Sequence, residues 1–323
     1  MIHTRFTVEN SRGAWPGDGK YNCDKGYACE EPTLLPMDKH GRSRWVDISS
    51  GGPESVDWWI EKEAWVKVSK TKGQLTGDGK NDVRVYITVD WEAVERMTPR
   101  PEHAMLAFKA SDTAHTNITI PLLHVDSPDP SFAGAVQGDG HVTMEASRFI
   151  SSRKASHIVG GIVSEWAEVP YFGRSYSGLT LLPPSRKNFD IGQGPSLTYA
   201  FWLTTLPPDY LNITLHLSPA LNLVNAERLA IGISLDDDSP VVIYPVPESK
   251  AGTLPPDWEQ VVSNEIRLVD VSLQMKRRDK GEHKIVLWGM STGLVVERLT
   301  VDLGGVRQRG VSYLGPTESE IIV

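Results

Sequence analysis

Apolar and polar residues alternate with a period of two in short runs along most of the chain. Turn-forming Gly, Pro, Asn, Asp and Ser separate the runs at intervals of about 8–15 residues, which is typical of β-sandwiches and barrels. The predicted strands are Arg44–Ser49, Val56–Lys62, Val83–Trp91, Met105–Ala110, Thr116–His124, His141–Ala146, Gly178–Leu182, Leu197–Thr204, Leu211–Leu217, Leu229–Ser234, Val241–Val246, Val271–Met275, His283–Trp288 and Leu294–Leu303.

Helical signals are few. The stretch "PPDWEQVVSNEIRL" predicts one short helix, with Asp257 as its N-cap and Glu259–Glu265 inside it. The stretch "DWEAVERM" adds about one further turn. Strands and helices do not alternate, which excludes a TIM barrel and a Rossmann fold. The expected fold class is therefore all-β, with two β-sandwich domains.

The best domain boundary is "HVDSPDPSFAG", because its Pro, Asp, Ser and Gly residues suit an exposed linker. We predict a leading segment or linker over 1–40, an immunoglobulin-like β-sandwich over 41–125, a linker over 126–133 and a larger jelly-roll-like β-sandwich over 134–319. Strand phase predicts the core of the second sandwich. Its expected members are Leu197, Tyr199, Phe201, Ile213, Leu215, Ile231, Ile233, Ile285 and Leu287.

Composition is that of a globular protein and excludes some partners. Of 323 residues, 40% are hydrophobic and 23% charged, and the net charge is −8. Without a basic stripe interleaved with aromatics, nucleic acid is not an expected partner. No apolar run reaches the roughly 20 residues of a membrane span. The first residues lack the apolar core of a signal peptide. The chain is thus either cytosolic or a piece without its upstream half.

Two features favour the second of these options. The only cysteines, Cys23 and Cys29, are spaced too widely for a CxxC site. They fit a small loop disulfide, worth about 2 kcal/mol in an oxidising compartment, or two free thiols in a surface loop. Two "NIT" sequons begin at Asn117 and Asn212. Both lie on the polar phase of a predicted strand, where a glycan would point to solvent.

Each acidic residue considered as a catalytic or calcium-binding candidate also has a purely structural interpretation. Glycoside hydrolysis needs two carboxyl groups roughly 5–10 Å apart, and Glu145, Glu165 and Glu168 are the candidates; the alternative is solvated acids on strands. The run Asp236-Asp237-Asp238 suits either calcium or a hairpin turn, and the turn is favoured. The scattered histidines contain no HxxxH pair and indicate no metal site. No cofactor is expected.

Tryptophans offer candidate sugar-stacking surfaces. Trp58, Trp59 and Trp166 are the candidates for carbohydrate binding, and the alternative is that they belong to the sandwich cores. Adjacent side chains on a strand face opposite sides. One of Trp58 and Trp59 is therefore expected outside the core.

Several motifs, in order along the chain, resemble one family. They are "GYACEEPTLLPMDKHG", "WVKVSKTKGQL", "VRVYITVDWEAV", "GDGHVTMEASRF", "WAEVPYFGRSYSGLTLLP", "LTYAFWL", "LHLSPALNLV", "LAIGISLDDDSPVVI", "GEHKIVLWGMSTGLVVERLTVDLGG" and the final "SYLGPTES". Together they resemble the C-terminal portion of glycoside hydrolase family 115, the xylan α-1,2-glucuronidases, in its fungal form. The match runs from about residue 8 to 319. Thr317 stands where the family pattern has a second proline.

The resemblance implies what is absent as well as what is present. The family's N-terminal domain, catalytic barrel and helical domain have no counterpart in this chain, so no residue inherits a catalytic role. The resemblance implies an extracellular parent enzyme and a non-catalytic accessory part with a structural or oligomerisation role. The alternative function is a module that docks on xylan through exposed aromatics. Expected partners are the missing catalytic domains, a second copy or xylan, but no nucleic acid and no membrane.

Overall fold

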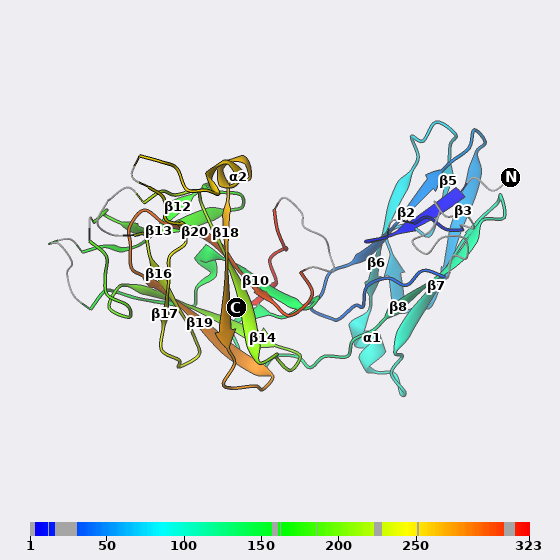
Figure 1. Cartoon of the computed structure of the whole chain (residues 1–323). Coiled ribbons are helices and arrows are strands. Elements are labelled where there is room, and N and C mark those ends of the chain that lie inside the picture. The colour runs from blue at the N-terminus through cyan, green and yellow to red at the C-terminus, as the bar shows by residue number, and fades with distance from the viewer. Residues whose placement is uncertain are drawn as a thin grey trace. The chain divides into compact units, whose positions relative to one another are not determined.

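The computed structural model describes residues 4–11, 13–16, 31–156, 161, 163–185, 187–222, 228–250, 252–306 and 314–323. It divides into two compact units, Met1–Val125 and Asp126–Val323. The chain is nearly all β, 45% strand and 5% helix. The predicted all-β class with sandwich domains is confirmed (Figure 1). The immunoglobulin-like and jelly-roll-like subtypes stay predictions.

The first unit consists of two four-stranded sheets around one core. One sheet has the order β1 (Thr4–Val8), β2 (Arg44–Ser50), β6 (Val83–Val89), β4 (Val66–Val68), and the other has the order β5 (Lys72–Leu75), β3 (Val56–Lys62), β7 (His103–Ala110), β8 (His115–Pro121). Alternating residues of both sheets, such as Ile48 and Leu106, fill the space between them and are fully buried. The period-two pattern thus defines which face of each strand is inside.

The second unit has larger sheets. Six strands form the first: β12 (Glu165–Pro170), β13 (Ser177–Leu182), β20 (Val295–Asp302), β15 (Tyr210–Leu217) and β18 (Arg267–Gln274), with β10 (His141–Glu145) paired to β20. Seven form the other: β17 (Val241–Ile243), β16 (Ile231–Leu235), β19 (Gly281–Gly289), β14 (Ser196–Leu203), β9 (Gly134–Val136) and β21 (Glu320–Ile322), with β11 (Ser151–Arg153) paired to β14. Figure 1 shows both sets of strands.

The predicted core of the second unit is confirmed. All nine residues predicted for it are at most 1% exposed and belong to one buried cluster. On β15, Ile213 and Leu215 are buried while Asn212 is exposed, so the strand phase is the predicted one. Burial of this many large apolar side chains is the main stabilising contribution to the unit.

The structure corrects several element boundaries. The predicted strand Val83–Trp91 ends at Val89, because Asp90 caps the short helix α1 (Trp91–Glu95) by accepting a hydrogen bond from the Ala93 N–H. Helix α2 spans only Trp258–Ser263, and Asp257 makes no side-chain cap bond because its carboxylate pairs with Arg267. The short strands β1, β4, β5, β9, β11, β12 and β21, and the 3-10 turn η1 (Ala146–Arg148), have no counterpart in the predicted set.

Candidate functional site

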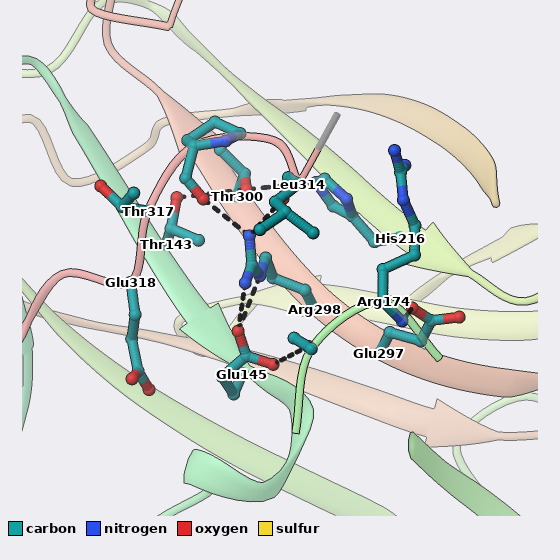
Figure 2. A network of polar contacts seen from close by, with 12 residues as sticks. Thr143, Glu145, Arg174, His216, Glu297, Arg298, Thr300, Leu314, Thr317 and Glu318 are labelled. Carbon is teal, nitrogen blue, oxygen red and sulfur yellow. Dashed lines mark hydrogen bonds and ion pairs between the residues drawn. The ribbon is translucent and has the colours of Figure 1, made fainter. Parts of the chain in front are cut away.

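A row of polar side chains crosses the outer face of the six-stranded sheet. Strand register places Glu145 of β10 opposite Arg298 of β20, and Arg298 opposite His216 of β15. Their inward neighbours, including Met144, Leu215 and Leu299, fill the core. The same alternation that buries the apolar residues therefore brings an acid, a guanidinium and an imidazole together (Figure 2).

Glu145 and Arg298 form a buried ion pair. The Arg298 Nε donates a hydrogen bond of 2.8 Å to Glu145 Oε1, and Arg298 Nη2 bonds the same oxygen. The other carboxylate oxygen accepts from the Ser175 hydroxyl. Glu145 is 1% exposed and Arg298 is 8% exposed. Both charges are thus compensated where they are largely buried, which a buried charge requires.

The chain's last residues cover this pair. We call residues 314–322 the C-terminal strap. The carbonyl oxygens of Leu314 and Pro316 each accept a hydrogen bond of 2.7 Å from Arg298 Nη1 (Figure 2). The Ser319 N–H donates to the Thr143 carbonyl, and the Thr143 N–H donates to the Ser319 hydroxyl, both at 2.9 Å. The strap then pairs as β21 with β9. The terminal motif is therefore part of the folded unit.

A second buried acid, Glu297, holds the β12–β13 connection. The ladder between β15 and β20 shifts register next to it, at His216/Leu217. The Glu297 carboxylate accepts a hydrogen bond of 2.9 Å from the Arg174 N–H and one of 2.6 Å from the Ser218 hydroxyl. Gly173 lies so close that an added Cβ would come within 2.4 Å of the Glu297 carboxyl carbon, and its φ is +86°. Only glycine fits there.

His216 corrects one prediction of the strand pattern. The alternation with Asn212 and Thr214 predicts that His216 faces solvent, yet its ring is buried beneath Gly315 of the strap. Its Nε2 lies 3.3 Å from the Thr300 hydroxyl. Burial, together with the positive charges of Arg298 and Arg174, lowers the His216 pKa to about 4, against a smaller opposing effect of Asp270. The imidazole is therefore neutral at pH 7.

We expect the free energy of unfolding of the second unit to fall as the pH drops from about 6.5 toward about 4. Unfolded His216 gains its proton near its ordinary pKa of about 6.5, whereas folded His216 stays neutral until about pH 4. Between these values the unfolded chain binds more protons, so stability present above pH 6.5 is lost on acidification. Urea unfolding across this range should show the slope in wild type and a flatter one in His216→Gln. Equal slopes would contradict this role of His216.

The three candidate acids lie in separate environments. Glu145 is sealed in the ion pair described above. Glu165 is half-buried and pairs with Lys154 at 2.8 Å, and Glu168 accepts a hydrogen bond of 2.6 Å from the Ser177 hydroxyl. Glu165 and Glu168 belong to β12, which pairs with β13, whereas Glu145 belongs to β10, which pairs with β20. None of the described contacts sets two of them across an open space as a hydrolytic pair requires.

The aspartate run is a hairpin turn. It joins β16 to β17, whose pairing includes Ile233 with Val241. Asp236 accepts from His283 Nδ1 at 2.9 Å and from the Lys284 N–H at 2.9 Å, and Asp238 pairs with Lys276. Burial opposes ionisation of Asp236, but these hydrogen bonds outweigh it and lower its pKa. The contacts favour the turn over calcium. Within the described ranges, no group of three His, Cys, Asp or Glu residues is arranged to hold a metal ion.

The three tryptophan candidates differ in how far their side chains are buried. Trp58 is 2% exposed and packs in the first core, where Gly73 lies against its ring, so it offers no face to a sugar. Its neighbour Trp59 is 39% exposed, as expected for the opposite side of β3. Trp166 is half-buried against the second core, and its ring N–H donates to the Pro195 carbonyl. Of the three, Trp59 is the most exposed.

The predicted modification sites differ in accessibility. Asn212 is exposed on β15, with its side chain on the outer face. Asn117 is half-buried, and its amide donates to Glu31 Oε1 at 2.6 Å. Cys23 and Cys29 lie outside the described residues, so their bridge stays a prediction. The most accessible sequon is therefore the one at Asn212.

Sequence reasoning missed Arg298, Glu297 and Arg174. A signal for the first two exists in "LVVERLTV", where two charges interrupt an apolar strand. Charged residues are almost never fully buried unless paired, so such an interruption indicates a partner. The partner strands, however, lie far away in sequence, and the pattern does not name them.

The fold is all-β, and the C-terminal strap covers the polar row of the second unit. Residues 134–318 match the family model described as the glycosyl hydrolase family 115 C-terminal domain. The match takes in β9 to β20 and most of the strap. The chain therefore belongs to this family, and the resemblance inferred from the motifs is confirmed at that level.

Comparisons with other proteins give weaker likenesses. The structure of BtGH115A, a 4-O-methyl-α-glucuronidase with specificity for decorated arabinogalactans, is 17% identical over 47% of this chain, with a TM-score of 0.33. This chain spans only 17% of that protein. The exo-β-1,3-galactanase of Phanerochaete chrysosporium is 10% identical, with 85% of this chain and 57% of that one covered and a TM-score of 0.29. At TM-scores this low the likenesses assign no function. No curated protein matched the sequence.

Among the residues that the structure describes, no helix is long and apolar enough to cross a bilayer.

Proposed function

We propose that this chain is the non-catalytic C-terminal accessory part of a fungal-type xylan α-1,2-(4-O-methyl)glucuronidase, with a structural or oligomerisation role. One observation carries the proposal: Glu145, the buried candidate acid, is fully engaged by Arg298 and Ser175 beneath the strap. A catalytic acid or base must instead reach a substrate atom at hydrogen-bond distance. The acid here stabilises the fold.

The proposal extends to partners and location. The expected partners are the catalytic domains of the same enzyme or a second copy of the chain. An extracellular location is supported by the predicted Cys23–Cys29 bridge and by the exposed Asn212 sequon. Mass spectrometry of the chain secreted from a eukaryotic host would test the bridge and the glycan together.

A second candidate function is docking on polysaccharide. It is favoured by three exposed aromatic side chains, Tyr171, Phe172 and Tyr176, in the connection between β12 and β13. Contiguous exposed apolar patches often mark interaction sites, whereas single exposed apolar residues are normal on a protein surface.

We expect the purified chain to release no 4-O-methylglucuronic acid from glucuronoxylan. Glu145, Glu165 and Glu168 are each engaged by a neighbouring side chain, whereas glycosidic cleavage needs two acids that face one substrate bond. Product release would be measured by chromatography, with an intact family 115 enzyme on the same substrate as positive control. Turnover that disappears in Glu145→Gln or Glu165→Gln would show that the active site lies in this chain and that the proposal is wrong.

A further inference from the structure

Strand β18 forms one edge of the six-stranded sheet and is the longest edge strand that the structure describes. It spans Arg267–Gln274 and pairs along its whole length with β15. In an antiparallel pair, about half of the backbone N–H and C=O groups point away from the partner strand. Within the described parts of the chain, no second strand or loop pairs with these outward groups of β18. An unpaired edge of this length is a template for a further strand.

The other sheet edges are protected against such pairing. The strands β4, β5, β11, β17 and β21 are only three or four residues long. The strands β1 and β8 receive backbone bonds from other segments of the first unit, and β10 receives them from the strap. The edge strand β12 carries Glu165, Glu168 and Pro170, which hinder pairing. On β18, Asp270 is the single exposed charge, so this edge is the least protected one.

The core-facing side chains of β18 are only partly covered. Val269, Val271 and Leu273 pack on the second core but remain partly exposed. Their three partners across the ladder on β15 are fully buried. The difference arises because β15 has a neighbouring strand on each side, whereas β18 has one. A strand added beside β18 would therefore bury apolar surface as well as pair backbone groups.

A second copy of β18 fits this edge. Opposite residues of an antiparallel pair lie on the same face of the sheet, so a twofold axis through the pair keeps the core-facing side chains together. Of the two registers with the fullest overlap, one places Asp270 opposite itself, and like charges directly opposite are destabilising. The other places Val271 opposite itself, Val269 opposite Leu273, and Asp270 opposite Ser272. The strand is therefore self-complementary in this second register.

We propose that β18 pairs antiparallel with β18 of a second copy and so joins two six-stranded sheets across a twofold axis. The proposal rests on the structural or oligomerisation role proposed above and names the surface that carries it. The pairing uses up the edge, so assembly stops at two copies. Because one strand pair is a small interface, a dissociation constant on the order of 10 μM is expected.

Sedimentation velocity of the whole chain over a concentration series tests the proposal. Ser272→Asp places a carboxylate opposite Asp270 of the second copy, and Ser272→Lys places an ammonium there. Ser272 is exposed on the outer face, so both changes leave the core intact. Ser152→Asp is the matched control, because it adds the same charge at an exposed strand position of the same unit.

The expected pattern is specific to the register. Wild type and Ser152→Asp should dimerise with the same dissociation constant. Ser272→Asp should weaken the dimer about tenfold, because the twofold axis repeats the unfavourable pair, whereas Ser272→Lys should strengthen it. Hydrogen exchange of the β18 amides should slow with rising concentration in wild type but not in Ser272→Asp. Circular dichroism would confirm that each variant is folded.

Three results overturn the proposal. The first is a wild type that stays monomeric up to about 1 mM, a hundredfold above the expected dissociation constant. The second is self-association that Ser272→Asp and Ser152→Asp change equally, or that continues beyond the dimer. The third is protection of the β18 amides only after the catalytic part of a family 115 enzyme is added, which would make that part the occupant.

The accessory function is tested independently of this pairing. A monomeric chain, or one whose β18 binds the catalytic part, remains compatible with that function. Release of 4-O-methylglucuronic acid by the chain would refute it whatever the oligomeric state is.

Discussion

Replacing Arg298 with alanine is expected to lower the free energy of unfolding of the second unit by about 3–5 kcal/mol. The change leaves the Glu145 carboxylate buried without its cation. It also removes the donor shared by the Leu314 and Pro316 carbonyls. Urea unfolding, monitored by hydrogen exchange of amides in β10 and β20, would report on the second unit alone.

Matched variants isolate the buried charge. Lys154→Ala breaks an exposed ion pair with Glu165 in the same unit and should cost about 0–1 kcal/mol. The double variant Glu145→Gln/Arg298→Met carries no unpaired charge, so it should be more stable than Arg298→Met alone. A loss in Arg298→Ala no larger than in Lys154→Ala would show that the pair does not hold the strap.

Removing residues 314–323 should destabilise the second unit by about 3 kcal/mol or more, on the basis of about 1 kcal/mol for each net hydrogen bond lost. The deletion removes both carbonyl acceptors of Arg298, the paired bonds between Ser319 and Thr143, and β21. It also uncovers His216 and takes away Ile321, which packs on the core. Thermal unfolding and hydrogen exchange at Thr143 would measure the effect.

A single exposed residue of the strap provides the control. Leu314 contributes its carbonyl, and its side chain is 56% exposed, so Leu314→Ala should change stability by no more than about 0.5 kcal/mol. Protection of the Thr143 N–H that survives the deletion would contradict the structural role of the strap.

Arg298 connects the strap to the β12–β13 connection. Glu145 binds Arg298 with one oxygen and Ser175 with the other, so loss of Arg298 should loosen both the strap and that connection.

The sequence determined the parts of this protein that depend on local periodicity. Period-two alternation identified most strands of both sandwiches and the phase that buries Ile213 and Leu215, because a strand with one face in the core repeats every second residue. Turn chemistry assigned Asp236–Asp238 to a hairpin, since Asp forms such turns within a few residues. Motif order identified the family, and the match over residues 134–318 agrees.

Only the tertiary structure decided which polar residues are buried. The polar phase of β15 predicts an exposed His216, but the strap, about a hundred residues later in the chain, covers it. Glu145 and Arg298 lie 153 positions apart, and nothing in either local pattern names the other. The same holds for Trp58 and Trp59, which are equivalent in sequence until packing against Gly73 places one of them inside. Local alternation defines the two faces of a strand, whereas long-range pairing decides what covers each face.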